Sequence, residues 1–105
     1  MYFKQAKYID SNEECRLVLR EYHDGTPALC IESVEWPEPV ATVSSNLGDH
    51  MQACLGEDEI FVKTYSENEG IYDDLIAAGV LTDCGKSAFN GFADFPIAKI
   101  NKEKI

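Results

Sequence analysis

Short apolar runs separated by turn residues divide the chain into a series of predicted β-strands. The clearest pair is "CRLVLREYH" and "PALCIESV", which flank Asp24-Gly25. An Asp-Gly pair between two such runs is typical of a two-residue hairpin turn. In that register the numbers of facing residues sum to 49, so Leu19 faces Cys30 and Cys15 faces Val34. The register therefore argues against a Cys15–Cys30 disulfide.

Five further segments have the aromatic and β-branched composition of strands. They are residues 2–9, 40–47, 60–65, 80–89 and 95–100. The prolines of "WPEP" (36–39) predict a bend or a sheet edge, and "NGF" (90–92) predicts the turn between the last two strands. Residues 48–59 leave one helical turn and an extended loop both open, and "NKEKI" at the end is expected to fray.

One helix is predicted over residues 71–78, where apolar residues recur at spacings of three and four. Ser66 and Glu69 before it have the spacing of a capping box, in which each side chain accepts the backbone N–H of the other residue. Gly79 fits the left-handed position after a helix, with Val80 folding back as in a Schellman stop. We interpret "SENEG" (66–70) as the start of this helix rather than as a catalytic site, with Asn68 exposed.

The order of strands, one helix and more strands predicts the fold class. We expect an α+β fold, with a mainly antiparallel sheet of about six to seven strands and one principal helix packed on one face. The length of 105 residues is that of a single domain over residues 1–105.

The acidic residues are distributed unevenly, because they concentrate in the middle of the chain. Residues 21–85 contain 14 acidic residues and one basic residue, a net charge of −13, within a chain whose total is −10. Such a field repels nucleic-acid phosphates and anionic lipid surfaces, so we expect no direct binding of nucleic acid or membrane. It favours a basic protein partner, with a purely solubilising role as the alternative.

Seven of these acids are a candidate interaction surface. Three precede the strand at 60–65 and four follow it, so the two groups could bracket one side of the domain. A six-residue strand spans about 20 Å, a scale compatible with mimicry of nucleic-acid charge. The seven residues are Glu57, Asp58, Glu59, Glu67, Glu69, Asp73 and Asp74.

Catalytic and metal-binding patterns are weak. His23 and His50 lack ligand neighbours, and Cys54 with His50, four residues apart, lacks an orienting third group. The four cysteines form no CxxC pair, so we expect them to be reduced and free of zinc. No calcium loop or phosphate-binding glycine loop is present, and we expect no cofactor, no metal and no catalytic residue. The apolar runs are too short to span a bilayer, and "MYFKQAKYIDSNEE" does not have the apolar core of a signal peptide, which predicts a cytoplasmic protein.

The passage "EIFVKTYSENEGIYDDLIAAGVL", followed by "NGF" and "FPIAKI", resembles a family of small acidic bacterial proteins of unknown function. Its members are found largely on mobile elements and phages, and the resemblance covers roughly residues 38–100. It implies a bacterial cytoplasm and an accessory or host-interaction role, and it assigns no active site to any residue.

Two functional hypotheses follow. The first is a non-enzymatic protein-binding or accessory module, for example an inhibitor or charge mimic that acts on a basic partner. The alternative is a small metal-dependent hydrolase that uses the carboxylates near the helix start. The protein is expected to be a monomer, or a homodimer formed through an exposed strand edge near "WPEP".

Overall fold

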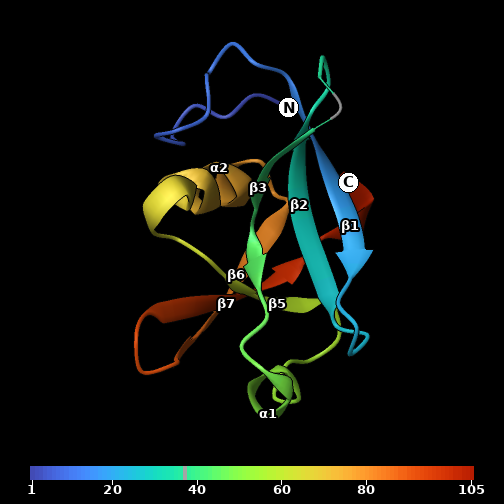
Figure 1. The fold of residues 1–105 in the computed structure, drawn as a ribbon, viewed down its shortest axis with the longest axis vertical. Coiled ribbons are helices and arrows are strands. Elements are labelled where there is room, and N and C mark those ends of the chain that lie inside the picture. The colour runs from blue at the N-terminus through green and yellow to red at the C-terminus, as the bar shows by residue number, and fades with distance from the viewer. Residues whose placement is uncertain (37) are drawn as a thin grey trace.

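The computed structural model describes residues 1–36 and 38–105. In this part of the chain the fold is α+β, with antiparallel sheets and one main helix, as predicted (Figure 1). The strands are β1 (Cys15–Glu21), β2 (Pro27–Ser33), β3 (Pro39–Thr42), β4 (Ser44–Ser45), β5 (Glu59–Val62), β6 (Leu81–Phe89) and β7 (Asp94–Ile100). The helices are α1 (Asp49–Gln52) and α2 (Ile71–Ala77), and the short 3-10 helices are η1 (Ser66–Asn68) and η2 (Lys102–Lys104).

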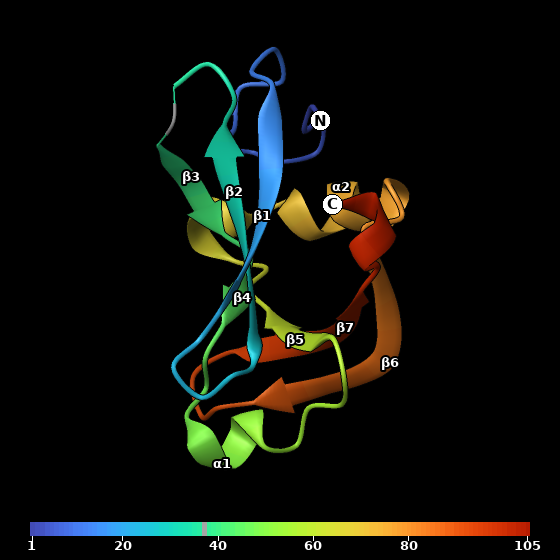
Figure 2. The same cartoon turned by 90° about the vertical axis from the view of Figure 1, so that its right-hand side faces the viewer.

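The strands form two sheets, so the prediction of one sheet covered by a helix was wrong. One sheet has the order β1-β2-β3 and the other β4-β5-β7-β6 (Figure 2). The chain passes between them at the buried Val43, whose N–H donates to Leu29 O over 2.8 Å. Its C=O accepts the N–H of Lys63, over 2.9 Å, on the side of the second sheet. The strand predicted at 40–47 is therefore divided, because its two halves pair with different neighbours.

The first hairpin forms as predicted, but its register differs by one residue. Leu19 faces Leu29 rather than Cys30, and the loop has three residues rather than two. Tyr22 N–H donates to Thr26 O over 2.8 Å, and the N–H of Gly25, at φ 83°, donates back to Tyr22 O. This is the geometry of a type I turn followed by a left-handed glycine, which also suits an Asp-Gly sequence.

Residues 2–9 do not form the predicted strand. Backbone N–H groups of this segment donate to the helix α2 rather than to a neighbouring strand. The N–H groups of Gln5 and Ala6 donate to the carboxylate of Asp74 over 2.8 and 2.9 Å. The buried side chains of this segment recur every third residue, which suits a loop lying over α2 better than an alternating strand. They are Phe3, Ala6 and Ile9.

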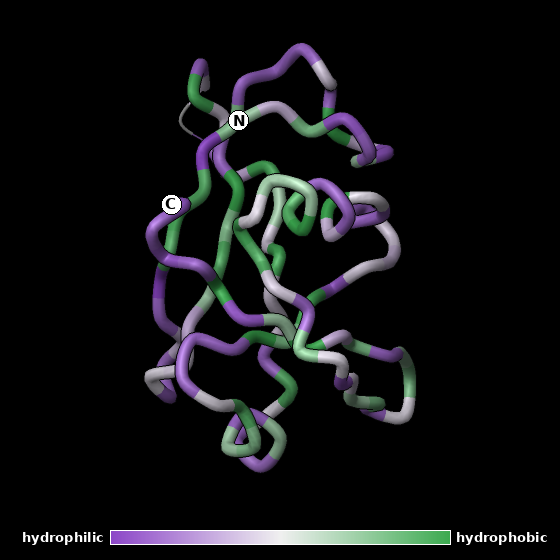
Figure 3. The backbone as a smooth tube through the Cα atoms, turned by 180° about the vertical axis from the view of Figure 1, so that it is seen from behind, coloured by the Kyte–Doolittle hydropathy of each residue, from purple (hydrophilic) through white to green (hydrophobic). Residues whose placement is uncertain are grey.

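Figure 3 shows the hydropathy of each residue along the folded backbone. Hydrophobic positions gather in the strands and in α2 at the centre, whereas the N-terminal segment is mostly hydrophilic with a few hydrophobic positions. The main core joins this segment, both sheets and α2 in one cluster of buried side chains. In the described residues no helix is long and apolar enough to cross a membrane.

The capping box at the start of the helix does not form. Ser66 has a left-handed φ of 58° and begins η1, and its side chain makes no capping hydrogen bond there. The helix α2 begins after Gly70, at φ 88°, where an added Cβ would lie 1.9 Å from the carbonyl oxygen of Gln5. The contact with the N-terminal segment therefore sets the helix start, and sequence spacing alone does not reveal it.

The end of α2 follows the predicted Schellman stop. Val80 N–H donates to Leu75 O over 3.0 Å and Gly79 N–H donates to Ile76 O over 3.1 Å. Gly79 has a φ of 75°, as a left-handed C′ residue requires. The two strands that follow also form as predicted, with a bulge in β6 between Asp83 and Lys86. The last residues, expected to fray, form η2.

A pair of glycine substitutions measures how tightly the N-terminal segment packs on α2. Gly70 and Gly91 have φ values of 88° and 89°, so alanine is strained at both, but only Gly70 has a neighbour within 4 Å. We expect Gly91→Ala to lower the free energy of unfolding by about 1–2 kcal/mol. Gly70→Ala should lower it by at least about 2 kcal/mol more, because Gln5 must move. Urea denaturation of both variants measures the difference, and equal losses would contradict the contact.

A second pair tests the carboxylate of Asp74. Asp74→Ala leaves the buried amide group of Ala6 and the half-buried one of Gln5 without an acceptor, and should lower the free energy of unfolding by about 3 kcal/mol. The control is Asp73→Ala, an exposed neighbour on the same helix, which should cost less than about 1 kcal/mol. Similar urea midpoints for the two variants would show that Asp74 does not hold the N-terminal segment.

Candidate binding groove

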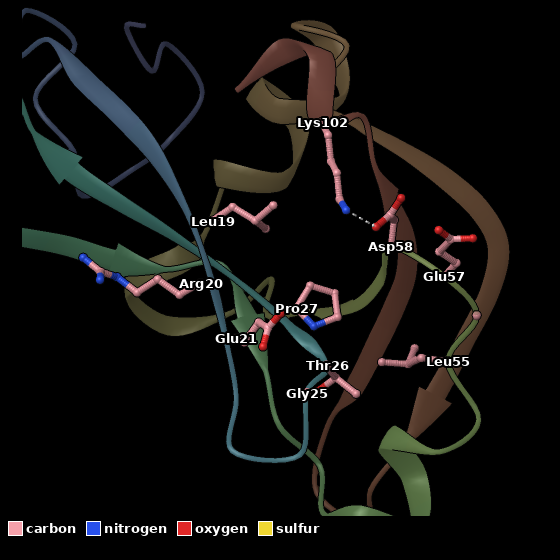
Figure 4. A pocket seen from close by; sticks show the side chains of 11 residues that line it. Leu19, Arg20, Glu21, Gly25, Thr26, Pro27, Leu55, Glu57, Asp58 and Lys102 are labelled. Atoms are coloured by element: carbon pink, nitrogen blue, oxygen red, sulfur yellow. Dashed lines mark ion pairs between the residues drawn. The ribbon is translucent and has the colours of Figure 1, made fainter.

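A groove of about 580 Å³ lies between β1 and the loop that joins α1 to β5. Figure 4 shows one side formed by β1 and the first hairpin turn, and the other by the α1–β5 loop, with Lys102 of η2 at one end. It is lined by Leu19, Arg20, Glu21, Gly25, Thr26, Pro27, Leu55, Gly56, Glu57, Asp58 and Lys102. Runs of consecutive residues line it, so backbone as well as side chains borders the groove.

The α1–β5 loop is held by hydrogen bonds to the first residue of β5 and the last residue of β7. The carboxylate of Glu59 accepts the N–H of Gly56 over 2.7 Å, and this hydrogen bond lowers the pKa of Glu59. Asp58 adopts a left-handed φ of 61°, and its C=O accepts the N–H of Ile100 over 2.8 Å. Glu59 therefore shapes the loop, while Glu57 and Asp58 face the groove from it.

The hairpin turn is fixed to α1 by a chain of polar contacts. The buried Gln52 donates from Nε2 to Thr26 Oγ1 over 2.9 Å, and its Oε1 accepts the N–H of Leu47 over 3.0 Å. Thr26 Oγ1 in turn donates to Asp24 Oδ1 over 2.6 Å. Because α1 leads directly into the α1–β5 loop, these contacts connect the two sides of the groove.

Both cations beside the groove are already paired. Lys102 Nζ lies 2.9 Å from Asp58 Oδ1, and Arg20 Nη2 lies 2.9 Å from Glu32 Oε2. Glu21 and Glu57 form no ion pair within the described residues.

The groove has a net negative field. The carboxylate of Asp58, and at longer range those of Glu57 and Glu21, raise the pKa of Lys102. All three carboxylates line the groove. A second cation that enters it would meet two carboxylates without a cationic partner.

The structure places the seven predicted acidic residues in different environments. Glu57 and Asp58 line the groove, and Glu59 braces its loop. The others follow the opposite end of β5, where the exposed Glu67 pairs with Lys63 at 2.6 Å, which lowers the pKa of Glu67 to about 2. Glu69 pairs more loosely with Lys7 at 3.7 Å, Asp73 is exposed, and Asp74 is buried beneath the N-terminal segment.

Several residues of the groove and its surroundings were not singled out from the sequence. Glu21, Leu55 and Lys102 reach the groove through tertiary contacts, whereas the Asp-Gly turn on one side, and Glu57 and Asp58 on the other, were singled out from the sequence. Asn68, predicted to be exposed, is fully buried and donates from Nδ2 to Thr42 O over 2.7 Å. It joins η1 to the end of β3.

The other candidate chemistry is not assembled. Cys54 Sγ contacts the backbone oxygen of His50 at 3.7 Å, and no contact joins the thiol to the imidazole in the described chain. The four cysteines form no disulfide, and burial raises the pKa of the Cys84 thiol, further raised by Glu59. No group of three or more His, Cys, Asp or Glu side chains is placed to hold a metal ion in residues 1–36 and 38–105.

Comparisons with protein-family models, with curated proteins and with solved structures found no significant match to this chain.

Proposed function

We propose that the protein is a non-enzymatic binding module that takes a basic segment of a partner protein into the groove between β1 and the α1–β5 loop. The observation that carries this proposal is the pair of carboxylates Glu21 and Glu57, which line the groove without a cationic partner in the described chain. An accessory role in a bacterial cell, which the family resemblance implies, is part of the same proposal.

The lining of the groove suits a lysine or arginine side chain. Leu19, Pro27 and Leu55 provide apolar surface for the aliphatic part of such a side chain, and the carboxylates provide acceptors for its charged end. Both parts are needed, because an exposed ion pair alone contributes at most about 1 kcal/mol.

The remaining acids contribute at longer range. A chain with a net charge of −10 attracts a basic partner before contact and speeds association, while its locally paired acids add little to the bound state. An inhibitor or a mimic of nucleic-acid charge would use the same surface. The hydrolase alternative has no assembled cluster of ligands in the described residues.

Selection from a displayed library of random linear peptides tests the proposal. We expect enrichment of lysine and arginine in the selected sequences, and binding of the best peptide that weakens about tenfold or more between 50 and 300 mM salt, because screening shortens the range of the attraction. Selected peptides without basic residues, or no selected peptide, would contradict it.

A pair of charge-matched double variants locates the site. Glu21→Gln with Glu57→Gln should weaken binding of the selected peptide by about tenfold or more. Glu35→Gln with Asp73→Asn removes the same charge from exposed residues outside the groove, and should change binding less than about threefold. Equal losses in the two variants would show that net charge, and not the groove, determines binding.

A further inference from the structure

The strand β1 has an open edge over the groove. It lies at the end of the order β1-β2-β3, and the hydrogen bond from Tyr22 N–H to Thr26 O sets which residues pair with β2. In an antiparallel ladder, hydrogen-bonded and non-bonded pairs alternate along the strand. The even-numbered residues of β1 therefore pair with β2. The odd-numbered residues Leu17, Leu19 and Glu21 direct their backbone N–H and C=O groups to the open edge.

The bonds of Cys15 support this assignment. Cys15 N–H donates to Met1 O over 2.8 Å, and the amino group of Met1 donates to Cys15 O. This edge of β1 therefore already accepts a paired backbone at its first residue. Within the described chain no turn or loop backbone hydrogen bond continues this pairing at Leu17, Leu19 or Glu21.

The other strand edges are less available. The backbone oxygen of Thr42, at the end of β3, accepts the side-chain amide of Asn68 over 2.7 Å. The strand β4 has two residues, and β6 is interrupted by its bulge, where Gly85 has a φ of 72°. Bulges and short edge strands are features that prevent pairing with a further strand. By contrast, β1 has seven residues and a regular register.

Two hollows border this edge. The groove lies beside Leu19 and Glu21, and a second hollow of about 290 Å³ lies beside Cys15 and Leu17. Residues of the C-terminal segment line both, with Lys102 in the first and Lys104 in the second. The two hollows therefore lie beside the part of β1 whose outward backbone N–H and C=O groups have no partner in the described chain.

We propose that the basic segment binds in an extended conformation, as a fourth strand added to the β1 edge of the β1-β2-β3 sheet. This inference rests on the proposed function and specifies the conformation of the ligand. Backbone hydrogen bonds to Leu17, Leu19 and Glu21 would supply affinity without sequence preference. Basic side chains at every second position share one face of an extended segment, so they would reach Glu21 and Glu57 together.

Hydrogen exchange measured by NMR tests the added strand. The probe is the peptide Thr-Lys-Val-Lys-Val-Lys-Thr, acetylated and amidated at its ends, and the control has glutamine in place of each lysine. At saturation we expect the amide groups of Leu17, Leu19 and Glu21 to exchange at least about tenfold more slowly than in the free protein. The amides of Val18 and Arg20, which pair with β2, should be protected in both states and serve as internal controls.

Two N-methylated forms of the probe supply an independent test. One carries methyl groups on the backbone nitrogens of its two valines, the other on those of two of its lysines. Alternate residues of an added strand direct their N–H groups to opposite edges, so one form should lose binding by about tenfold or more and the other should retain it. Each form serves as the control for the other.

The outcomes separate this inference from the proposed function. Binding of the lysine peptide with no slowed exchange at the three amides, or with equal effects of the two methylations, overturns the added strand and leaves a basic groove. Slowed exchange with equal binding of the glutamine peptide supports the added strand and overturns the preference for basic ligands. No binding of either peptide at millimolar concentration overturns both. If exchange at these amides slows when the protein concentration is raised in the absence of peptide, the β1 edge pairs with a second copy of the chain, and the inference is overturned.

Discussion

The arrangement of the N-terminal segment depends on the hydrogen bonds that the carboxylate of Asp74 accepts. This carboxylate accepts the backbone N–H groups of Gln5 and Ala6 in a buried position, where an unpaired charge or amide would be costly. The same contact brings the carbonyl of Gln5 against Gly70 and allows only glycine there. It also anchors the segment that returns Met1 to Cys15, so a helix residue determines where the open edge of β1 begins.

The corner at Val43 supplies the second constraint. Because this residue donates to Leu29 and accepts from Lys63, the chain leaves the first sheet through β3 and enters the second through β4. The two sheets are thus joined along one side of β2, and β1 on its other side is left at the edge. The groove lies where this edge meets the α1–β5 loop of the second sheet.

Features decided by neighbouring residues could be predicted from the sequence, and features decided by distant partners could not. The Schellman stop at Gly79 and the Asp-Gly hairpin depend on local backbone preferences, although the register also depended on loop length. Asp74 has the helical spacing of the buried Ile71 and Leu75, but its charge placed it in the predicted acidic surface, and its contacts with Gln5 and Ala6 explain its burial. In the groove, Glu57 and Asp58 belonged to the predicted acidic surface, whereas Glu21 and Lys102 lie far from them in sequence.

An open strand edge usually invites pairing with another copy of the same chain. Here each copy has a net charge of −10, so two copies repel one another at long range, most strongly at low salt. A basic segment meets the opposite field, and beside the edge it finds Glu21 and Glu57 without cationic partners in the described chain. The acidic composition would thus have two effects at the open edge of β1. It disfavours pairing of β1 with a second copy of the chain, and it favours pairing with a basic strand.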